Sequence, residues 1–451
     1  MEIPLKNRSH WSSSFSFFLV AVGSAVGLGN IWKFPYIAGE NGGGAFVLIY
    51  LLCIALVGLP IFVAELYIGR QGQSNIVHSF NVLEKKKSRW RVVGYLGILS
   101  AFVILSFYSV VGGWIIDYFL KALSFSFEAK SSAQITGMLQ HLFSSPGKQI
   151  IYHMVFMSFT FLIVVGGISK GIERWSKLLM PAFLTLLFAL FVYSTTTTGF
   201  KASLSFLFYP DFSMLTPSGV LEAVGHSFFT LSLGMGAIMT YGSYLKKNED
   251  LIKTAFYIGL ADTIIALMAG VVIFSIVFTY GFEPGAGPKL MFETLPVLFS
   301  KDAAGNYLAM SFFGLVLFAA LTSSVSLLQV VVSYFEENSH LSKFTITFIS
   351  SFSIFCIGIL SALSTNLLSD FHIIEGLTFF DFFDKLSSHY LLPIGGLLMA
   401  IFFGWKIDTE DIKKIFSDHP KTKFYFFVLI WSNRVVAPLA IFIMILNSIF
   451  G

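Results

Sequence analysis

Long apolar stretches separated by short polar segments follow one another along almost the whole chain. Many reach roughly 20 residues, the length of α-helix that crosses about 30 Å of hydrocarbon at 1.5 Å per residue. A soluble protein of this size would have shorter apolar runs broken by charges, so we predict an all-α integral membrane protein. Eleven transmembrane helices are expected, near residues 12–37, 42–70, 91–124, 150–168, 175–198, 217–244, 252–281, 306–336, 344–363, 375–405 and 424–449.

The composition agrees with this prediction. Of the 451 residues, 55% are hydrophobic and only 12% are charged, which is about half the charged fraction of a soluble domain. Both cysteines, Cys53 and Cys356, lie in apolar stretches without a metal or redox motif, so we interpret them as small hydrophobic core residues. The first apolar run is too long for the core of a signal peptide and lacks an A-x-A-like cleavage site, so we expect this span to be retained.

Lys and Arg are distributed unevenly between the polar segments. If the N-terminus is cytoplasmic, 20 of the 29 Lys and Arg residues fall in cytoplasmic segments and seven in outer segments or span ends. Cytoplasmic loops carry such an excess, so we predict a multi-pass protein of the plasma (inner) membrane with a cytoplasmic N-terminus. An odd number of spans then places the C-terminus in the extracellular or periplasmic space. Because these charges flank the spans, the net charge of +4 reflects topology and indicates no nucleic-acid partner.

Two of the predicted spans contain clusters of glycine and polar residues at mid-span. The first has Gly23, Gly27, Gly29 and Asn30, and the sixth has Thr230, Ser232, Gly234 and Gly236. Each Gly costs about 1 kcal/mol in a helix, and unwound backbone at membrane depth is tolerated only where it is buried in protein or lines a cavity. Freed carbonyls can coordinate cations, and new helix N-termini can hold an anion. Close helix packing through small residues is the alternative explanation.

The positions of these clusters favour unwinding. The first and sixth spans are the first members of two five-span units, residues 11–198 and 217–405, and the helix at 424–449 lies outside both. Five is odd, so the second unit enters the membrane from the opposite side, which makes the units inverted repeats within a single transporter domain, residues 1–451. Interrupted helices at corresponding positions of two halves indicate the binding site of a secondary transporter.

At these residues the chain resembles the neurotransmitter:sodium symporter family, especially its bacterial amino-acid transporters. The resemblance rests on GSAVGLGNIWKFPY followed by NGGGAF, on FFTLSLGMGAIMTYGSY and on ALTSSVSLLQ. It covers residues 11–337 well and the tenth span, residues 375–405, more loosely. The implied fold is the LeuT-type 5+5 inverted repeat with discontinuous helices 1 and 6, plus one extra helix.

The resemblance implies two sodium sites and no organic cofactor. The first would use the Ala25 carbonyl, Asn30, Thr230 and Asp262, completed by the carboxylate of the substrate. The second would use the carbonyls of Gly23, Val26 and Ala319 with the hydroxyls of Thr322 and Ser323. Hydroxyls at such helix positions usually bond back to the carbonyl four residues earlier, which is the structural alternative for Thr322 and Ser323.

Asp262 stands where the family often has Asn. An ionisable residue at mid-span indicates a function, and here it would supply the negative charge that chloride contributes in eukaryotic relatives. We therefore expect transport to be independent of chloride. A protonated, hydrogen-bonded Asp262, or an Asp262 that cycles a proton, are the alternatives. His226 replaces a common Gln near Asp262 and either pairs with it, titrates, or is a neutral structural residue.

The resemblance also implies a substrate pocket between spans 1, 3, 6 and 8. Its expected residues are Ser24, Ala25, Val26, Gly29, Ile104, Tyr108, Phe229, Thr230, Ser232, Met235, Ser323 and Leu327. Monoamine-carrying relatives have Asp where this chain has Gly27, so the resemblance implies an α-amino acid recognised by its amine and carboxylate. No charge lines the side-chain end, which favours a hydrophobic L-amino acid, aromatic ones included. The Tyr108 hydroxyl would donate to the carboxylate, or would make an ordinary structural bond.

Two gates are implied on either side of the pocket. The expected gate residues are Lys33 and Asp381 outside, with Phe229 and Tyr108 closing over the substrate, and Arg8, Glu337, Trp11, Tyr244 and Gln329 inside. Lys cannot make the two-pronged contact of Arg with a carboxylate, and Lys33 extending to the membrane surface is the alternative. For Arg8 and Glu337 the alternative is an ordinary cytoplasmic surface pair.

These features together predict a sodium-coupled symporter that works by alternating access. Its partners would be an amino acid, sodium and the lipid bilayer; its oligomeric state is not predicted. No HExxH motif is present, and we do not expect an enzyme. An amino-acid sensor on the same scaffold remains the alternative, because binding and transport would use the same residues.

Overall fold

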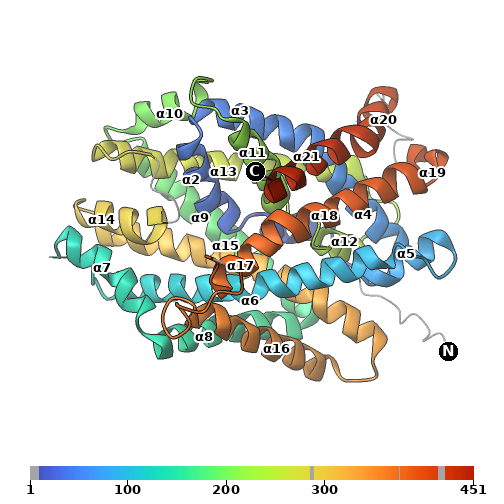
Figure 1. The fold of residues 1–451 in the computed structure, drawn as a ribbon, viewed down its shortest axis with the longest axis horizontal. Coiled ribbons are helices and arrows are strands. Elements are labelled where there is room, and N and C mark those ends of the chain that lie inside the picture. Colours follow the sequence, from blue (N-terminus) through green and yellow to red (C-terminus); the bar gives the residue numbers. More distant parts are fainter. Residues whose placement is uncertain (1–9, 129, 285–288, 375, 415–421, 451) are drawn as a thin grey trace.

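The computed structural model describes residues 10–414, except 129, 285–288 and 375, and residues 422–450. The described residues form α-helices and short π-helical segments (η) without a β-strand (Figure 1). The helices up to residue 208 are α1 (Ser14–Ala25), η1 (Gly29–Lys33), α2 (Phe34–Glu40), α3 (Gly44–Cys53), η2 (Ile54–Gly58), α4 (Leu59–Gly72), α5 (Ile76–Glu84), α6 (Arg91–Leu123), α7 (Ser132–Phe143), α8 (Pro146–Val165), η3 (Ile168–Glu173), α9 (Arg174–Ser194) and α10 (Phe200–Phe208).

The second part of the chain continues in the same manner. Its helices are α11 (Pro217–Thr230), α12 (Ala237–Gly242), α13 (Leu251–Thr279), η4 (Leu290–Thr294), α14 (Leu295–Ser300), α15 (Gly305–Asn338), α16 (Lys343–Leu363), α17 (Phe379–Lys385), η5 (Leu386–Leu391), α18 (Leu392–Ile401), η6 (Phe402–Lys406), α19 (Thr409–Lys413), α20 (Thr422–Trp431), η8 (Ser432–Val436) and α21 (Ala437–Phe450).

Among the described residues, nine helices are long and apolar enough to cross a membrane. A tenth crossing results if Ser14–Ala25 and Gly29–Glu40, which are bent by 50° at a short break, are counted as one span. The predicted sixth span consists of two short helices, α11 and α12, with 14 and 6 residues. The structure therefore confirms an all-helical architecture with nine or ten apolar helices, and the count of eleven stays a prediction.

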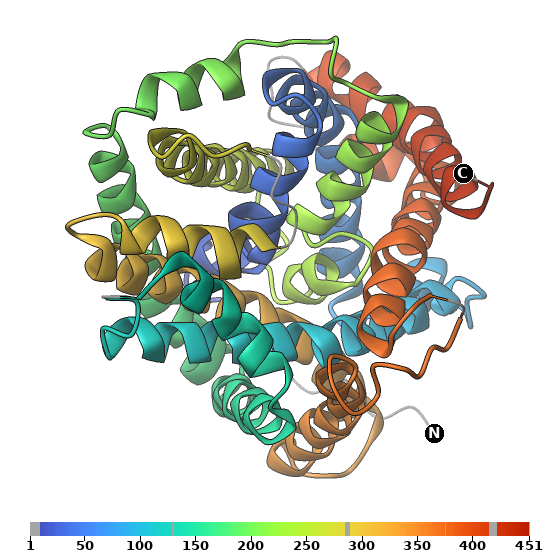
Figure 2. The same cartoon turned by 60° about the vertical axis from the view of Figure 1, so that its left-hand side comes forward.

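The two longest helices, α6 and α15, pack along each other and form the centre of the molecule. Of their most apolar parts, 83% and 89% are buried, against 39% in α8 and 44% in α16, which lie further out. Glycine permits the close approach of α8 to α6, because a Cβ on Gly113 would lie 2.8 Å from the backbone nitrogen of His153. This buried scaffold holds the two broken helices in the interior (Figure 2).

Both predicted interruptions are present. Helix α1 ends at Ala25, and the chain becomes extended at Val26 before η1 begins at Gly29. In the sixth predicted span the six residues between α11 and α12 turn through three left-handed positions, at Ser232 (φ +55°), Gly234 (φ +80°) and Gly236 (φ +74°). Glycine adopts this conformation without steric cost, which explains two of the three positions.

Polar side chains near the C-terminal end hold further irregular backbone. Ser432 donates to the carbonyl of Leu56 in η2, and the Asn433 Nδ2 donates to the carbonyl of Pro60 at 3.1 Å. The Arg434 Nε donates to the carbonyl of Gly404 in η6 at 2.5 Å. Pro60 has no N–H to donate to the carbonyl of Leu56 four residues earlier, and Ser432 of η8 supplies a donor in its place.

Candidate functional site

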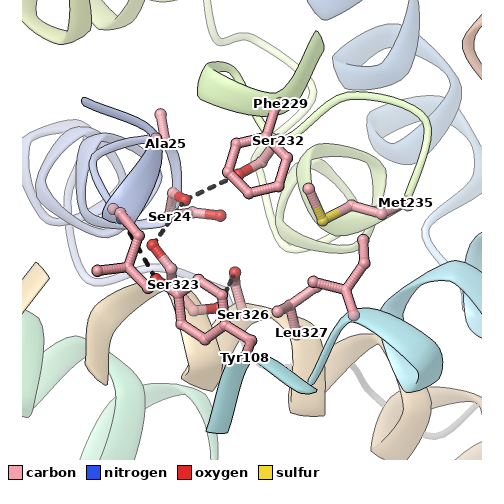
Figure 3. Close-up of a pocket in the computed structure, with 13 residues that line it drawn as sticks. Ser24, Ala25, Tyr108, Phe229, Ser232, Met235, Ser323, Ser326 and Leu327 are labelled. Carbon is pink, nitrogen blue, oxygen red and sulfur yellow. Dashed lines mark hydrogen bonds between the residues drawn. The ribbon is translucent and has the colours of Figure 1, made fainter. Parts of the chain in front are cut away.

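The two helix breaks face each other across a cavity (Figure 3). The Ser232 Oγ, in the second break, donates to the Ser24 carbonyl at 2.8 Å. From α15, the Ser323 Oγ lies 3.3 Å from the Ser24 carbonyl and 3.2 Å from that of Val26. Carbonyls at the end of a helix lack intrahelical partners, and here the partners are hydroxyls from the opposite break and the scaffold.

The cavity is small, with about 30 Å³ of free space, which is room for about two water molecules. Its lining residues are Ser24, Ala25, Gly27, Leu28, Gly29, Ile104, Tyr108, Phe229, Ser232, Met235, Ser323, Ser326 and Leu327. Ten of the twelve predicted pocket residues are among them, and Val26 and Thr230 are not. None of the lining side chains carries a charge.

Leu28 and Ser326 were not predicted as pocket residues. Ser326 lies three residues after Ser323 on α15, and its Oγ donates to the Ser323 carbonyl at 2.7 Å. Residues three apart on a helix share a face, so the position of Ser323 was a signal that could have identified Ser326. Leu28 lies within the first break, and its backbone N–H faces the Tyr108 hydroxyl at 3.4 Å.

Gly27 leaves no room for a side chain. A Cβ at this position would lie 2.5 Å from the Ser323 Oγ and 3.1 Å from the Tyr108 hydroxyl oxygen. An acidic residue would have to displace both groups. The space next to Gly27 is therefore occupied by two hydroxyls. A pocket for an amine substrate that lacks a carboxylate would need an acidic side chain in this space.

A fully buried polar cluster lies beside the cavity and joins both breaks. The Asn30 Nδ2 donates to the Asp262 carboxylate at 2.7 Å and to its main-chain carbonyl at 3.2 Å. The Thr230 hydroxyl donates to the same carboxylate at 3.0 Å. The Asn30 side-chain oxygen accepts the Gly27 N–H at 3.1 Å. The structure thus brings together Asn30, Thr230 and Asp262, three of the four protein residues predicted for the first sodium site, and Ala25 lines the adjoining cavity.

The residues predicted for the second sodium site also meet. A Cβ on Gly23 would lie 3.2 Å from the Thr322 Cβ, and the Ser323 hydroxyl reaches the Val26 carbonyl. The Thr322 hydroxyl bonds back to the carbonyls of Phe318 and Ala319 at 3.1 and 3.0 Å. In this conformation Thr322 therefore makes the bond to its own helix that was the structural alternative to a sodium ligand, whereas the Ser323 hydroxyl reaches across to the first break.

Among the described residues, no group of three His, Cys, Asp or Glu side chains could hold a metal ion. A cation at the two clusters would therefore be coordinated mainly by neutral oxygens, from carbonyls, hydroxyls and an amide. Such oxygens are the ligands of hard cations. Sodium fits this donor set, with Asp262 as the one carboxylate.

Glu65 on α4 is a candidate site residue that was not predicted from the sequence. Its side chain is fully buried, and its Oε1 accepts the N–H of Gly234, in the second break, at 2.8 Å. A signal was available, because Glu65 is the one acidic residue within the predicted span 42–70, and ionisable residues inside a span indicate function. Glu65 supplies the partner that the unwound Gly234 has lost.

His226 does not pair with Asp262. Its ring lies against Phe34 and Tyr50, with centroids 5.9 and 5.3 Å away. Within the described part of the chain, neither ring nitrogen of His226 has a hydrogen-bond partner. This geometry agrees with a neutral, aromatic-packed histidine, which was one of the predicted alternatives.

On one side of the cavity, Lys33 covers Phe229, with its Nζ 4.8 Å from the ring centroid. The predicted ion pair with Asp381 is not formed in this structure, because Asp381 bonds the Thr378 hydroxyl at 2.7 Å in the first turn of α17.

On the opposite side of the cavity, residues that were predicted for the inner gate pack against one another. Trp11 is buried, and its Nε1–H donates to the Tyr241 carbonyl at 3.1 Å. Its ring lies edge-on to Tyr241 and Tyr244, and the Gln329 amide lies 3.3 Å from the Tyr244 hydroxyl. Trp11, Tyr244 and Gln329 therefore meet as predicted.

The predicted pair of Arg8 and Glu337 has a different outcome. The Glu337 Oε2 accepts from Ser74 and from both nitrogens of Asn75, each at 2.8 Å, where α4 passes into α5. Arg8 lies outside the described residues. The role of this pair as a gate stays a prediction.

Comparison with known proteins gives consistent matches over the whole chain. A model of the Sodium:neurotransmitter symporter family matches residues 8–136 and 130–451. An uncharacterized sodium-dependent transporter, YhdH, of Bacillus subtilis is 39% identical over 440 residues, 97% of each chain. An uncharacterized sodium-dependent transporter of Haemophilus influenzae is 37% identical over 458 residues, 99% of each chain. The crystal structure of MhsT in complex with L-phenylalanine superposes with a TM-score of 0.90 at 42% identity, covering 98% of this chain and 100% of that one.

Replacing Trp11 with Ala should open the side of the molecule that it closes. Leu245 is buried next to Trp11, so a cysteine introduced as Leu245→Cys reports whether a thiol reagent can reach this region. The exposed Cys356 would also react, so the measurement uses a Cys356→Ser background. Truncating a buried Trp costs about 3–5 kcal/mol, so we expect thiol labelling in detergent to accelerate at least about tenfold. Phe15→Ala, at a side chain that is 65% exposed, is the control, and equal labelling rates in all three proteins would contradict a closing role for Trp11.

Proposed function

Since this chain belongs to the sodium:neurotransmitter symporter family, we propose that it is a sodium-coupled symporter that imports hydrophobic L-amino acids, aromatic ones included, by alternating access. The family consists of membrane transporters and its members are not enzymes. The observation that carries the proposal is the uncharged cavity between two broken helices, directly beside the buried cluster of Asn30, Thr230 and Asp262.

The lining of the cavity supports an α-amino acid as the substrate. Backbone groups of the first break and the Tyr108 hydroxyl are available for the carboxylate and amine, and Ile104, Met235 and Leu327 form an apolar end. Without a charged lining residue, a charged side chain would be buried without a partner, which is costly. The 42% identical MhsT was solved with L-phenylalanine, which supports extending the proposal to aromatic substrates.

Two sodium ions would bind next to the substrate. One would lie among Ala25, Asn30, Thr230 and Asp262, where the substrate carboxylate completes the ligand set. The other would lie among Gly23, Val26, Ala319, Thr322 and Ser323. Sodium and substrate then stabilise each other through a shared contact, and this differential binding provides the free energy that couples them. The fixed charge of Asp262 makes chloride unnecessary in this mechanism.

Alternating access would use the two barriers that flank the cavity. Phe229 under Lys33 covers one side, and Trp11 with Tyr241 and Tyr244 closes the other. The Lys and Arg distribution supports placing Trp11 on the cytoplasmic side of the plasma membrane and the C-terminus outside. The inverted repeats, residues 11–198 and 217–405, would exchange the two barriers by rocking the first and sixth spans with spans 2 and 7 against a scaffold that includes α6 and α15.

Uptake into proteoliposomes tests the proposal. With purified protein, labelled leucine and phenylalanine should accumulate when the external buffer contains sodium and the internal buffer contains potassium, because the sodium gradient drives entry. Replacement of external sodium by choline should reduce uptake to the level of protein-free vesicles. Equal uptake in the two buffers would contradict sodium coupling, and sodium-dependent binding without counterflow of labelled substrate would indicate a sensor instead.

Asp262→Asn tests the source of the negative charge. The amide keeps the size and a hydrogen-bond acceptor but removes the charge beside the first proposed sodium site. We expect uptake by this variant to require chloride, or its apparent sodium affinity to fall by about tenfold or more, equivalent to about 1.4 kcal/mol. Wild-type uptake should be equal in chloride and gluconate. Chloride-independent uptake by Asp262→Asn with unchanged sodium affinity would show that the carboxylate has no such role.

A further inference from the structure

The unwound residues between α11 and α12 touch α18 backbone to backbone. A Cβ on Gly395 of α18 would lie only 2.3 Å from the carbonyl oxygen of Gly234. In the other direction, a Cβ on Gly234 would lie 2.2 Å from the Leu392 carbonyl oxygen. Real Cβ atoms do not approach so closely, so this contact exists only because both positions are glycine. The three atoms nearest to each of these Cβ positions are backbone atoms.

Helices other than α18 also contact residues 234–236. The Gly234 N–H is held by Glu65 on α4 at 2.8 Å. A Cβ on Gly97 of α6 would lie 3.4 Å from the main-chain carbonyl of Met235, and one on Gly236 would lie 2.7 Å from Ile76 Cδ1. The path of residues 234–236 is therefore set mainly by contacts of their backbone with the surrounding helices.

The same segment supplies the apolar end of the cavity. The Met235 side chain points from it into the cavity (Figure 3), and Met235, Ile104 and Leu327 all line the cavity. Helix α18, all of whose residues are described, contributes no lining residue. It touches the segment from outside, so the distance at which the segment rests against α18 determines how far Met235 projects into the cavity.

We propose that Gly395 is a specificity-determining positioning residue, whose missing side chain lets residues 234–236 rest against α18 and leaves the cavity long enough for an aromatic amino acid. This inference rests on the proposed amino-acid transport. Gly395 touches no substrate and acts through Gly234 and Met235. A methyl group on residue 395 would collide with the Gly234 backbone, which cannot rotate away as a side chain could. We therefore expect residues 234–236 to shift as a unit toward the cavity and to shorten its apolar end.

The test is the substrate-size preference of Gly395→Ala in proteoliposomes. The readout is the ratio of sodium-dependent uptake efficiencies, kcat/KM, for tryptophan and valine. We expect the tryptophan-to-valine ratio to fall by about tenfold, at the lower end of the range for one methylene in an apolar pocket, with little change for valine. A general loss of stability or expression would lower both efficiencies together and leave the ratio unchanged.

Two further variants make the result specific. Gly225→Ala, on α11, is the matched control, because its Cβ would meet only the flexible Met444 sulfur at 3.2 Å, and its ratio should equal that of the wild type. Met235→Ala in the Gly395→Ala background should restore part of the tryptophan uptake, since it shortens the side chain that the added methyl group pushes inward but leaves the shift of the backbone in place.

The outcomes separate the two levels of the proposal. An unchanged tryptophan-to-valine ratio in Gly395→Ala, with sodium-dependent valine uptake retained, overturns the role of Gly395 and leaves the transport proposal standing. Wild-type protein without sodium-dependent uptake of either amino acid overturns the transport proposal itself. If Gly395→Ala alone is not monodisperse in detergent, Met235→Ala is compared with the double variant, where the added Gly395→Ala substitution must again lower the ratio; equal ratios there overturn the inference.

Discussion

A backbone hydrogen-bonding group inside a bilayer needs a partner within the protein, and the two broken helices leave several without their intrahelical partners. The structure meets this constraint with few side chains. The hydroxyls of Ser232 and Ser323 donate to carbonyls of the first break. The Glu65 carboxylate accepts the N–H of Gly234 in the second break. The long α6 and α15 supply the rigid surroundings in which these groups stay aligned. Without these partners the unwound segments would be unstable at membrane depth.

The same constraint explains how a transport site can arise at the breaks. Carbonyls and hydroxyls that satisfy one another across a cavity can also satisfy a sodium ion or the polar end of an amino acid. Asp262 is connected to both breaks through Asn30 and Thr230, so a change of charge or ligand at this cluster acts on both broken helices together. Trp11 lies just before the start of α1, and Phe229 lies at the end of α11, directly before the second break.

The sequence supported these conclusions where chemistry is local. Glycine and polar residues at mid-span predicted both breaks, and the motifs around Asn30, Thr230 and Ser323 predicted most of the cavity. The outer pair of Lys33 and Asp381 stays a prediction, because Asp381 bonds Thr378 in this structure and the tenth span matches the family pattern only loosely. Glu65 and Gly395 were not predicted because their roles come from contacts with Gly234, which is distant from both along the chain. The sixth predicted span consists of two short helices, α11 and α12, and the count of eleven crossings stays a prediction.

The central claim is that sodium and the amino acid bind as one interdependent set at the two breaks. The most direct measurement is equilibrium binding of labelled leucine to purified protein in a scintillation-proximity format, across a series of sodium concentrations, together with sodium titrations with and without leucine. The account predicts that leucine affinity rises with sodium and that leucine raises the apparent affinity for sodium by the same factor, as linkage requires. Leucine affinity that is equal in sodium and in choline would contradict it.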